Sequence, residues 1–231
     1  AFKSHHNAAR ARDDGRLGVE IAPVHLSPKY ATTVTTDSLI RADTSVEALS
    51  KLKPVFDRRY GSVTAGNASP LTDGAAAVLL MSEEKAKALG YVPLAYIKAW
   101  AVAAVDPGWQ LLMGPALAVP MALSRAGLTL GDMDLIEMHE AFGAQVASNI
   151  QALESDTFAR ERLGRSSRVG LVDRERLNVC GSSIAIGHPF GATGARITGV
   201  LGHEMTRRNS KFGLISVCAQ GGMGFAMILE R

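Results

Sequence analysis

Apolar runs of strand length alternate with helical segments from Ala75 to the C-terminus, and this alternation constrains the fold more than any other feature. The predicted strands are Ala75–Met81, Leu94–Val105, Asp134–Met138 and two within Phe212–Glu230. The predicted helices are 82–90, 115–125, 141–153 and 192–208. Ala75–Met81 is apolar almost throughout, which is typical of a strand buried on both faces. The order of strands and helices predicts an α/β protein with layers of helix and sheet.

Local signals mark the ends of several elements. Ser82 is expected to cap a short helix that stops at Gly90, and Ala219–Gly222 is expected to join the last two strands as a hairpin. The opening run Ala1–Arg12 has a helical pattern but no capping residue before it, so the chain is expected to begin inside a helix. The segment Ile21–Asp57 is rich in Pro, Thr, Ser and Asp, which predicts irregular backbone on the surface.

Composition excludes several classes of protein. The 231 residues are 47% hydrophobic and 20% charged, which is typical of a packed globular protein and excludes a disordered tail or a coiled coil. The formal charge of +3, from 25 basic and 22 acidic side chains, gives no reason to expect nucleic acid as a partner. The apolar stretches are too short to cross a bilayer as helices, so we expect no transmembrane segment.

The chain has only two cysteines, Cys180 and Cys218, in unlike sequence contexts. A disulfide framework is therefore not expected, and a reducing compartment is favoured: the bacterial cytoplasm or the mitochondrial matrix rather than secretion. The six histidines and two cysteines show no metal-ligand spacing, and no Gly-x-Ser-x-Gly nucleophile elbow occurs. We expect neither a metal site nor a serine hydrolase.

Three turns place a histidine or a cysteine where packing alone does not require one. In the first, Glu137–Phe142, a buried strand ends and a helix begins, so side chains and free backbone N–H groups face a cleft. A single histidine at a strand end, here His139, is more often a hydrogen-bonded core residue than a catalyst. Burial of the adjacent Glu140 without a partner would be costly, which favours a functional site.

The second turn, Gly187–Arg196, surrounds His188 with three glycines and a proline. The glycine spacing matches neither the Walker pattern nor the dinucleotide fingerprint, so we interpret the loop as holding His188 in place as an acid, a base or a thiol activator. The third turn, Val217–Gly224, follows an apolar strand that ends with Cys218. Buried cysteines are usually inert, but backbone amides at this turn can lower the pKa of the thiol and stabilise an oxyanion. Cys180 lacks such a context, and we interpret it as structural.

Taken together and in this order, the three turns resemble the C-terminal half of the thiolase family, acyltransferases that cleave or form 3-ketoacyl-CoA. Asn178–Arg196 (NVCGSSIAIGHPFGATGAR) is similar to one family signature, and Cys218–Gly224 (CAQGGMG) is similar to a second. Thr64–Ala76 (TAGNASPLTDGAA) resembles the family's CoA-side loop. The resemblance extends over essentially the whole chain and implies a thiolase-like fold of α/β/α layers with a mixed sheet.

His139 refines this resemblance. Most thiolases carry Asn at the start of an Asn-Glu-Ala-Phe motif, whereas His139–Phe142 (HEAF) resembles the β-subunits of the fatty-acid-oxidation trifunctional complex. Lys53–Phe56 and the polar stretch 154–177 also resemble that branch. The resemblance therefore implies an acetyl-CoA C-acyltransferase of fatty acid β-oxidation, which cleaves 3-ketoacyl-CoA with CoA to acetyl-CoA and a shortened acyl-CoA.

The same resemblance implies roles for individual residues. Cys218 would be the acid/base that handles the CoA thiol or the substrate α-carbon proton. His188 would activate the acyl-accepting cysteine and help to hold an oxyanion, and His139 would position the water that completes that oxyanion site. The backbone N–H of Gln220, where the family usually has Gly, would be the second oxyanion donor. The residues that would line the pantetheine channel are Ser69, Ala141 and Phe142.

The family's acyl-accepting cysteine belongs to the N-terminal half, and no residue of this chain matches its surroundings. Cys180 lies where the family usually has Asn. By resemblance, residues 1–70 are the latter part of a loop domain, 71–92 the closing strand and helix of the N-terminal domain, and 93–231 a complete C-terminal domain. The first strands of the N-terminal domain have no counterpart.

The leading hypothesis is the C-terminal portion of a 3-ketoacyl-CoA thiolase, fully active only with the missing half. Two alternatives stay open: a truncated, non-catalytic thiolase-like subunit that binds CoA or a partner, and a biosynthetic acetoacetyl-CoA thiolase. The resemblance further implies no covalently bound cofactor, CoA as substrate, a homodimeric thiolase core and a partner subunit with hydratase and dehydrogenase activities.

Overall fold

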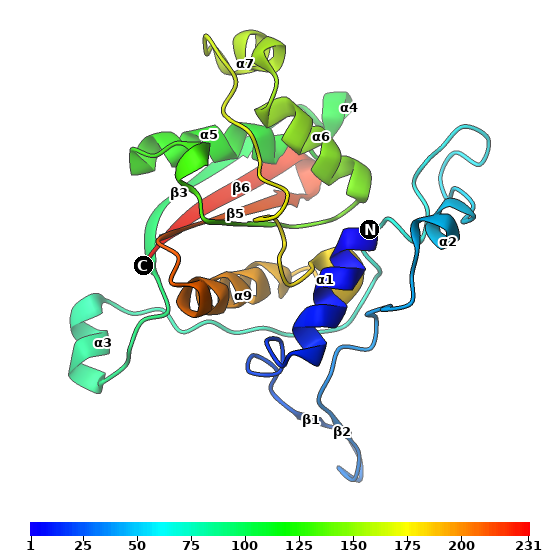
Figure 1. The fold of residues 1–231 in the computed structure, drawn as a ribbon, viewed down its shortest axis with the longest axis vertical. Coiled ribbons are helices and arrows are strands. Elements are labelled where there is room, and N and C mark those ends of the chain that lie inside the picture. The colour runs from blue at the N-terminus through cyan, green and yellow to red at the C-terminus, as the bar shows by residue number, and fades with distance from the viewer.

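A four-stranded mixed sheet forms the centre of the computed structural model, which describes residues 1–231 (Figure 1). Its strands, in the order in which they lie in the sheet, are β3 (Tyr96–Ala104), β6 (Met223–Glu230), β5 (Phe212–Ala219) and β4 (Leu135–Met138). β6 pairs antiparallel with β3 and β5, whereas β4 and β5 are parallel. A single parallel bridge from Leu177 to Ile136 continues the ladder beyond β4.

Helices cover the two faces of this sheet. Figure 1 shows α5 (Gly114–Ala126) and α6 (Gly143–Leu153) on one side, and α9 (Thr193–Arg208) with α1 (Phe2–Asp13) on the other. Successive side chains of a strand point to opposite faces of the sheet. The strands therefore contribute to two separate hydrophobic clusters, one between the sheet and α5 and one between the sheet and α9. This arrangement confirms the predicted α/β/α layering.

The predicted helix boundaries are largely confirmed. Ser82 caps α3 (Glu83–Leu89) by accepting a hydrogen bond from the backbone N–H of Lys85, and the helix ends at Gly90 in the left-handed conformation. α5 likewise ends at Gly127 with a positive φ. The remaining elements are the short strands β1 (Val24–His25) and β2 (Thr33–Val34), the helices α2 (Val46–Ser50), α4 (Pro107–Gln110), α7 (Asp156–Leu163) and α8 (Ser183–Ile186), and the 3-10 turns η1 (Leu130–Asp132) and η2 (Gln220–Gly222).

The segment Ile21–Asp57 is mostly exposed and irregular, as the sequence predicts. It contains only the two-residue pairing of β1 with β2 and the five-residue helix α2, none of which is buried. Figure 1 shows β1 and β2 projecting from the body of the molecule. None of the helices is long and apolar enough to cross a bilayer.

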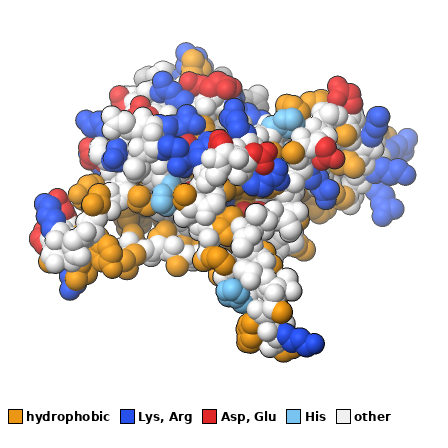
Figure 2. Space-filling model, turned by 60° about the horizontal axis from the view of Figure 1, so that its bottom comes forward, with side chains coloured by type: hydrophobic (Ala, Val, Ile, Leu, Met, Phe, Trp, Pro, Cys, Tyr) orange, Lys and Arg blue, Asp and Glu red, His pale blue; other side chains and the backbone are white.

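The prediction of a buried strand at Ala75–Met81 is wrong for this chain. The segment forms no strand, and Val78, Leu79 and Leu80 are 40%, 72% and 66% exposed. A strand needs neighbours for its backbone groups, and no other segment pairs with this one. Figure 2 shows hydrophobic side chains gathered at the surface beside the lobe that α3 forms at the left.

Candidate active site

The carboxyl ends of β4 and β5 bring two of the three predicted turns together. Because these strands are parallel and adjacent, the residues that follow β4 lie beside the end of β5, and the backbone N–H of His139 donates to the carbonyl of Ser216 at 2.8 Å. His188 arrives from the loop before α9, and its ring lies 4.0 Å from that of His139 between centroids. The backbone N–H of Ala141 faces the thiol of Cys218. The sequence-predicted residues His139, His188 and Cys218 therefore belong to one region.

His139 is almost completely buried, with 1% of its surface exposed. Its Nδ1 lies 2.7 Å from the hydroxyl of Ser183. Burial, with smaller contributions from His188 and Arg196, lowers the pKa of His139 to about 3. The imidazole is therefore neutral at physiological pH and carries a single ring proton.

His188 is less buried than His139 and is held at two points. Its backbone N–H donates to the hydroxyl of Thr72 at 2.9 Å, and its Nδ1 lies 2.6 Å from the hydroxyl of Thr193 at the start of α9. Burial, followed by the charge of Arg196, lowers its pKa. A neutral imidazole with one anchored nitrogen is suited to accept a proton.

Cys218 is 4% exposed, and burial raises the pKa of its thiol to about 11. The backbone amides of Cys218 and Ala141 act in the opposite direction, as the sequence predicts, but the cost of burying the thiolate outweighs them. The expectation of a lowered pKa is therefore wrong. The thiol is protonated at neutral pH, which suits a proton donor.

Gln220 begins the tight turn η2 that follows Cys218, and its side chain is exposed. The turn is fixed to the end of β3, since the backbone N–H of Val105 donates to the carbonyl of Gly222 at 2.9 Å. The structure thus places the Gln220 backbone in the same turn as Cys218 and shows no contact between Gln220 and the two histidines.

The three residues expected to line a channel lie together. The backbone N–H of Ser69 donates to the carbonyl of Ala141 at 2.9 Å, and Ala68 forms an isolated antiparallel bridge with Phe142. The ring of Phe142 also meets that of Phe56 edge to face at 6.3 Å between centroids. Backbone hydrogen bonds and this ring contact therefore hold the loop around Ser69 against the turn that carries His139.

An open hollow of about 800 Å³ adjoins His188. Its walls are residues 71–76 on one side and residues 188–192 on the other, and half of its lining is apolar. His188 lines this hollow, whereas His139 and Cys218 do not. No cluster of three or more His, Cys, Asp or Glu side chains has the geometry of a metal site.

Sequence reasoning missed the hydrogen bonds that hold this region together. Glu140 is buried but paired: its Oε1 accepts from Asn178, and its Oε2 accepts from Ser4 at 2.6 Å and from the backbone N–H of Ile184 at 3.1 Å. Glu140 therefore braces the turn, and its burial does not by itself indicate catalysis. Ser4 is 136 residues away in the chain, and no local pattern could have identified it.

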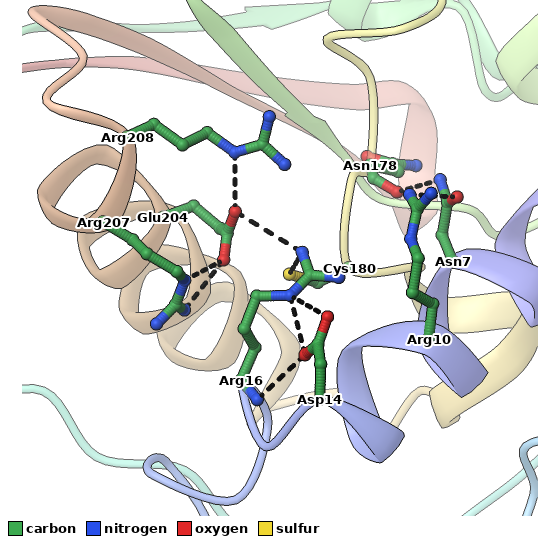
Figure 3. Close-up of polar contacts among 9 residues, drawn as sticks. All are labelled: Asn7, Arg10, Asp14, Arg16, Asn178, Cys180, Glu204, Arg207 and Arg208. Atoms are coloured by element: carbon green, nitrogen blue, oxygen red, sulfur yellow. Dashed lines mark hydrogen bonds and ion pairs between the residues drawn. The ribbon is translucent and has the colours of Figure 1, made fainter.

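Cys180 lies in a separate ion cluster, as Figure 3 shows. Glu204, whose side chain is 1% exposed, pairs with Arg207 and Arg208 at 2.8 Å and with Arg16 at 3.6 Å. The guanidinium of Arg16 also lies 3.5 Å from the Cys180 sulfur. Burial raises the pKa of that thiol. The charge of Arg16 acts in the opposite direction but is outweighed by burial and by Glu204 and Glu137, so the thiol is not activated as a nucleophile.

Comparison with known proteins places both parts of the chain in one family. The model of the thiolase N-terminal domain matches residues 1–84, and that of the thiolase C-terminal domain matches residues 91–231. The curated 3-ketoacyl-CoA thiolases of Alteromonas mediterranea and Escherichia coli O157:H7 are each 51% identical over 230 residues. These matches cover 100% of this chain and 52% of each relative, so the chain spans about half their length.

Solved structures agree with this placement. The Bacillus anthracis acetyl-CoA acetyltransferase superposes with a TM-score of 0.84 at 42% identity, covering 99% of this chain and 54% of its own. The human mitochondrial 3-ketoacyl-CoA thiolase superposes with a TM-score of 0.81 at 36% identity, covering 99% and 53%. The same human enzyme in complex with CoA gives a TM-score of 0.80 at 36% identity, covering 99% and 52%.

Proposed function

Because the chain belongs to the thiolase family, we propose that it forms the C-terminal half of a 3-ketoacyl-CoA thiolase. The complete enzyme would cleave 3-ketoacyl-CoA with CoA to acetyl-CoA and a shortened acyl-CoA. The observation that carries the proposal is the contact of the His139 and His188 rings at 4.0 Å, beside the turn whose Ala141 amide faces the Cys218 thiol. Acyl transfer between thiols needs a base, a proton-carrying thiol and hydrogen-bond donors at one place.

Cys218 is assigned the proton transfers. A thiol with a pKa of about 11 is protonated at neutral pH, so it can give its proton to the α-carbon of the departing acetyl-CoA. The thiolate that remains then takes the proton of the incoming CoA thiol, and the enzyme returns to its starting state.

The two histidines are assigned activation of the acyl-accepting cysteine and stabilisation of the oxyanion. His188, neutral because its pKa is lowered, takes the proton of the acyl-accepting cysteine and returns it when CoA displaces that cysteine from the acyl group. His139, also neutral, supplies a donor to the oxyanion site either directly or through the water that it positions. The backbone N–H of Gln220 serves as the second oxyanion donor.

The acyl-accepting cysteine is assigned to a part of the protein, or to a second chain, other than these 231 residues. Residues 1–70 act as part of a loop domain, 71–92 with the helix α3 as the closing part of an N-terminal domain, and 93–231 as the C-terminal domain. Ser69, Ala141 and Phe142 line the pantetheine channel, for which their mutual contacts give support.

CoA is the proposed co-substrate, with no covalently bound cofactor. The proposed assembly is a homodimeric thiolase core, with a hydratase and dehydrogenase subunit as its further partner. The proposed compartment is the bacterial cytoplasm or the mitochondrial matrix, in keeping with the bacterial and human mitochondrial proteins to which the chain is similar.

The proposal is tested by intact mass spectrometry and a thiolysis assay. We expect the 231-residue chain alone to show no turnover of 3-ketoacyl-CoA, and the chain combined with a thiolase half that carries the acyl-accepting cysteine to show turnover. Substrates of several acyl lengths are compared in the same assay.

Three outcomes would overturn parts of this proposal. Turnover at an enzyme-like rate by the chain alone would contradict the assignment of the nucleophile to another segment. CoA binding without turnover in the combined protein would favour a non-catalytic subunit. Activity restricted to acetoacetyl-CoA would favour a biosynthetic thiolase.

A further inference from the structure

A chain of three side chains, two of them buried and the third half-buried, leads from α9 to the candidate site. The Nη2 of Arg196 donates to the hydroxyl oxygen of Ser183 at 3.1 Å, and that oxygen lies 2.7 Å from Nδ1 of His139. Ser183 belongs to the short helix α8 and has no exposed surface. These contacts connect a permanent cation to one of the two ring nitrogens of His139.

The directions of the two hydrogen bonds follow from what each group can donate. A guanidinium has donors only, so Ser183 must accept from Arg196. The hydroxyl then has one proton to place, and the structure shows no acceptor for it other than Nδ1 of His139. A proton on Nδ1 would leave the buried hydroxyl proton without a partner, at a cost of about 1–3 kcal/mol.

We infer that Ser183 and Arg196 are positioning residues that hold His139 in the tautomer with its proton on Nε2, so that His139 presents a fixed hydrogen-bond donor to the site. The Nε2 atom makes no hydrogen bond within the chain, and it is not among the polar atoms sealed from solvent. It is therefore free to meet a ligand oxygen or a water molecule. The imidazole is neutral, so the ring has no second proton to offer at Nδ1.

Arg196 itself is fixed by burial and charge. Its Nε and Nη1 are buried without a hydrogen-bond partner, and the buried carboxylate of Glu137 has an unpartnered Oε2. Glu137 is the largest favourable charge acting on the guanidinium, with Glu140, Asp37 and Glu20 contributing less. Burial raises the pKa of Glu137 well above its usual range, and the charge of Arg196 acts in the opposite direction. Ser183 is the only hydrogen-bonded partner of the guanidinium.

No comparable pair of hydrogen bonds fixes the tautomer of His188. Its Nδ1 lies 2.6 Å from the hydroxyl of Thr193, but that hydroxyl has a second acceptor, the carbonyl of Pro189 at 3.4 Å. No obligatory donor fixes Thr193, so its proton can point either way and His188 can carry its own proton on either nitrogen. One histidine is thus a permanent donor and the other an exchangeable acid/base. The catalytic roles of the two histidines rest on the proposed thiolase function. The assignment of the His139 tautomer rests only on the hydrogen bonds of Ser183.

The test is side-chain ¹⁵N NMR of the full chain, with the His139 signals assigned by their loss in His139→Asn. We expect a protonated Nε2 and an unprotonated Nδ1 for His139 throughout the neutral pH range. Protonation at Nδ1, or a mixture of the two tautomers, would overturn the inference.

Two adjacent serines provide a matched pair of variants. Ser183→Ala removes this pair of hydrogen bonds, so a second tautomer is expected to appear at His139. Ser182→Ala truncates a neighbour that is equally buried but whose hydroxyl makes no hydrogen bond, so the wild-type spectrum is expected. Arg196→Met, if it folds, should resemble Ser183→Ala because the serine can then accept from Nδ1. A single Nε2–H tautomer in Ser183→Ala would show that the serine does not set it.

Kinetics of the complete enzyme give an independent readout. Ser183→Ala is expected to lower kcat on the order of tenfold with KM unchanged, because the donor is mispositioned while the substrate contacts remain. Ser182→Ala should leave kcat unchanged. A raised KM with unchanged kcat would overturn the positioning role. If the protein is not a thiolase, no thiolysis will be measured for the wild type or the variants. The NMR measurement will still show which nitrogen of His139 carries the proton.

Discussion

At the scale of single residues, the surroundings of a side chain decide which protonation state it offers to the chemistry. His139 and Cys218 are 1% and 4% exposed, and burial shifts each toward its neutral form, with pKa values of about 3 and about 11. Glu140 is also buried, but three donors satisfy its carboxylate. Burial therefore leaves His139 a neutral hydrogen-bond donor and Cys218 a protonated thiol. Glu140, which is also buried, holds the turn in place through its hydrogen bonds.

The proton-transfer role of Cys218 is testable by a single-atom change. Cys218→Ser is expected to lower kcat of the complete enzyme by about 10²–10⁴-fold, since a serine hydroxyl is a far weaker acid than a thiol. His188→Ala is expected to abolish acyl transfer. Cys180→Ser is the control, because that thiol lies in the ion cluster around Arg16, and it should retain most of the activity. Wild-type thiolysis by either site variant would contradict the assignment.

The buried His139 predicts a specific loss of stability in acid. An unfolded histidine binds a proton near pH 6.5, whereas His139 in the folded chain does so only near pH 3. The unfolded state therefore binds more protons between these values, and stability falls as the pH is lowered through this window. From pH 6.5 to 4.5 the contribution is about 2 kcal/mol, measurable by urea unfolding. His139→Asn should lose less stability over the same range, and equal losses would refute the prediction.

At the scale of elements, close backbone contacts fix the turn that carries Cys218 and Gln220. Gly222 has a φ of +83°, and a Cβ there would lie 2.3 Å from the carbonyl oxygen of Val105. Gly221 also has a positive φ, but a Cβ there would meet nothing within 4 Å. A side chain at either glycine would strain the backbone, but only a side chain at Gly222 would also collide with Val105. Substitutions at the two positions therefore distinguish the cost of the backbone conformation from the cost of the collision.

This pair of glycines gives a matched prediction. Gly221→Ala should cost about 1 kcal/mol, the strain of a left-handed conformation, as measured by chemical unfolding of the full chain. Gly222→Ala adds a collision with backbone that cannot move aside, and should cost about 3 kcal/mol in total and disturb the end of β3. Equal effects of the two substitutions would show that contact with Val105 does not hold the turn.

At the scale of the whole molecule, the chain has a complete sheet and an apolar segment that nothing covers. Residues 75–81 form neither helix nor strand and are largely exposed, and Ala75 and Ala76 line the hollow that His188 also lines. Exposed apolar patches often mark interaction surfaces, and under the proposed function this segment would contact the part of the protein that carries the acyl-accepting cysteine. Its placement next to the site agrees with a thiolase whose acyl-accepting cysteine arrives on that side.

The role of this segment is tested by Leu79→Lys. Leu79 is 72% exposed, so the change should alter the free energy of unfolding of the chain by less than about 0.5 kcal/mol. It should, however, prevent association with a thiolase half that carries the acyl-accepting cysteine, as followed by analytical ultracentrifugation. Leu171→Lys, at a residue 62% exposed on another surface, should associate normally. Normal association of Leu79→Lys would contradict the role of the segment.

The sequence by itself determined the layered fold, most element boundaries and the turns that hold His139, His188 and Cys218. These features depend on local periodicity, capping residues and glycine-rich motifs, which can be identified within short windows. Only the tertiary structure decided that Glu140 is braced by Ser4, that burial raises the pKa of Cys218, and that residues 75–81 form no strand. Pairing, burial and desolvation depend on groups far apart in the chain, so no local pattern of residues specifies them.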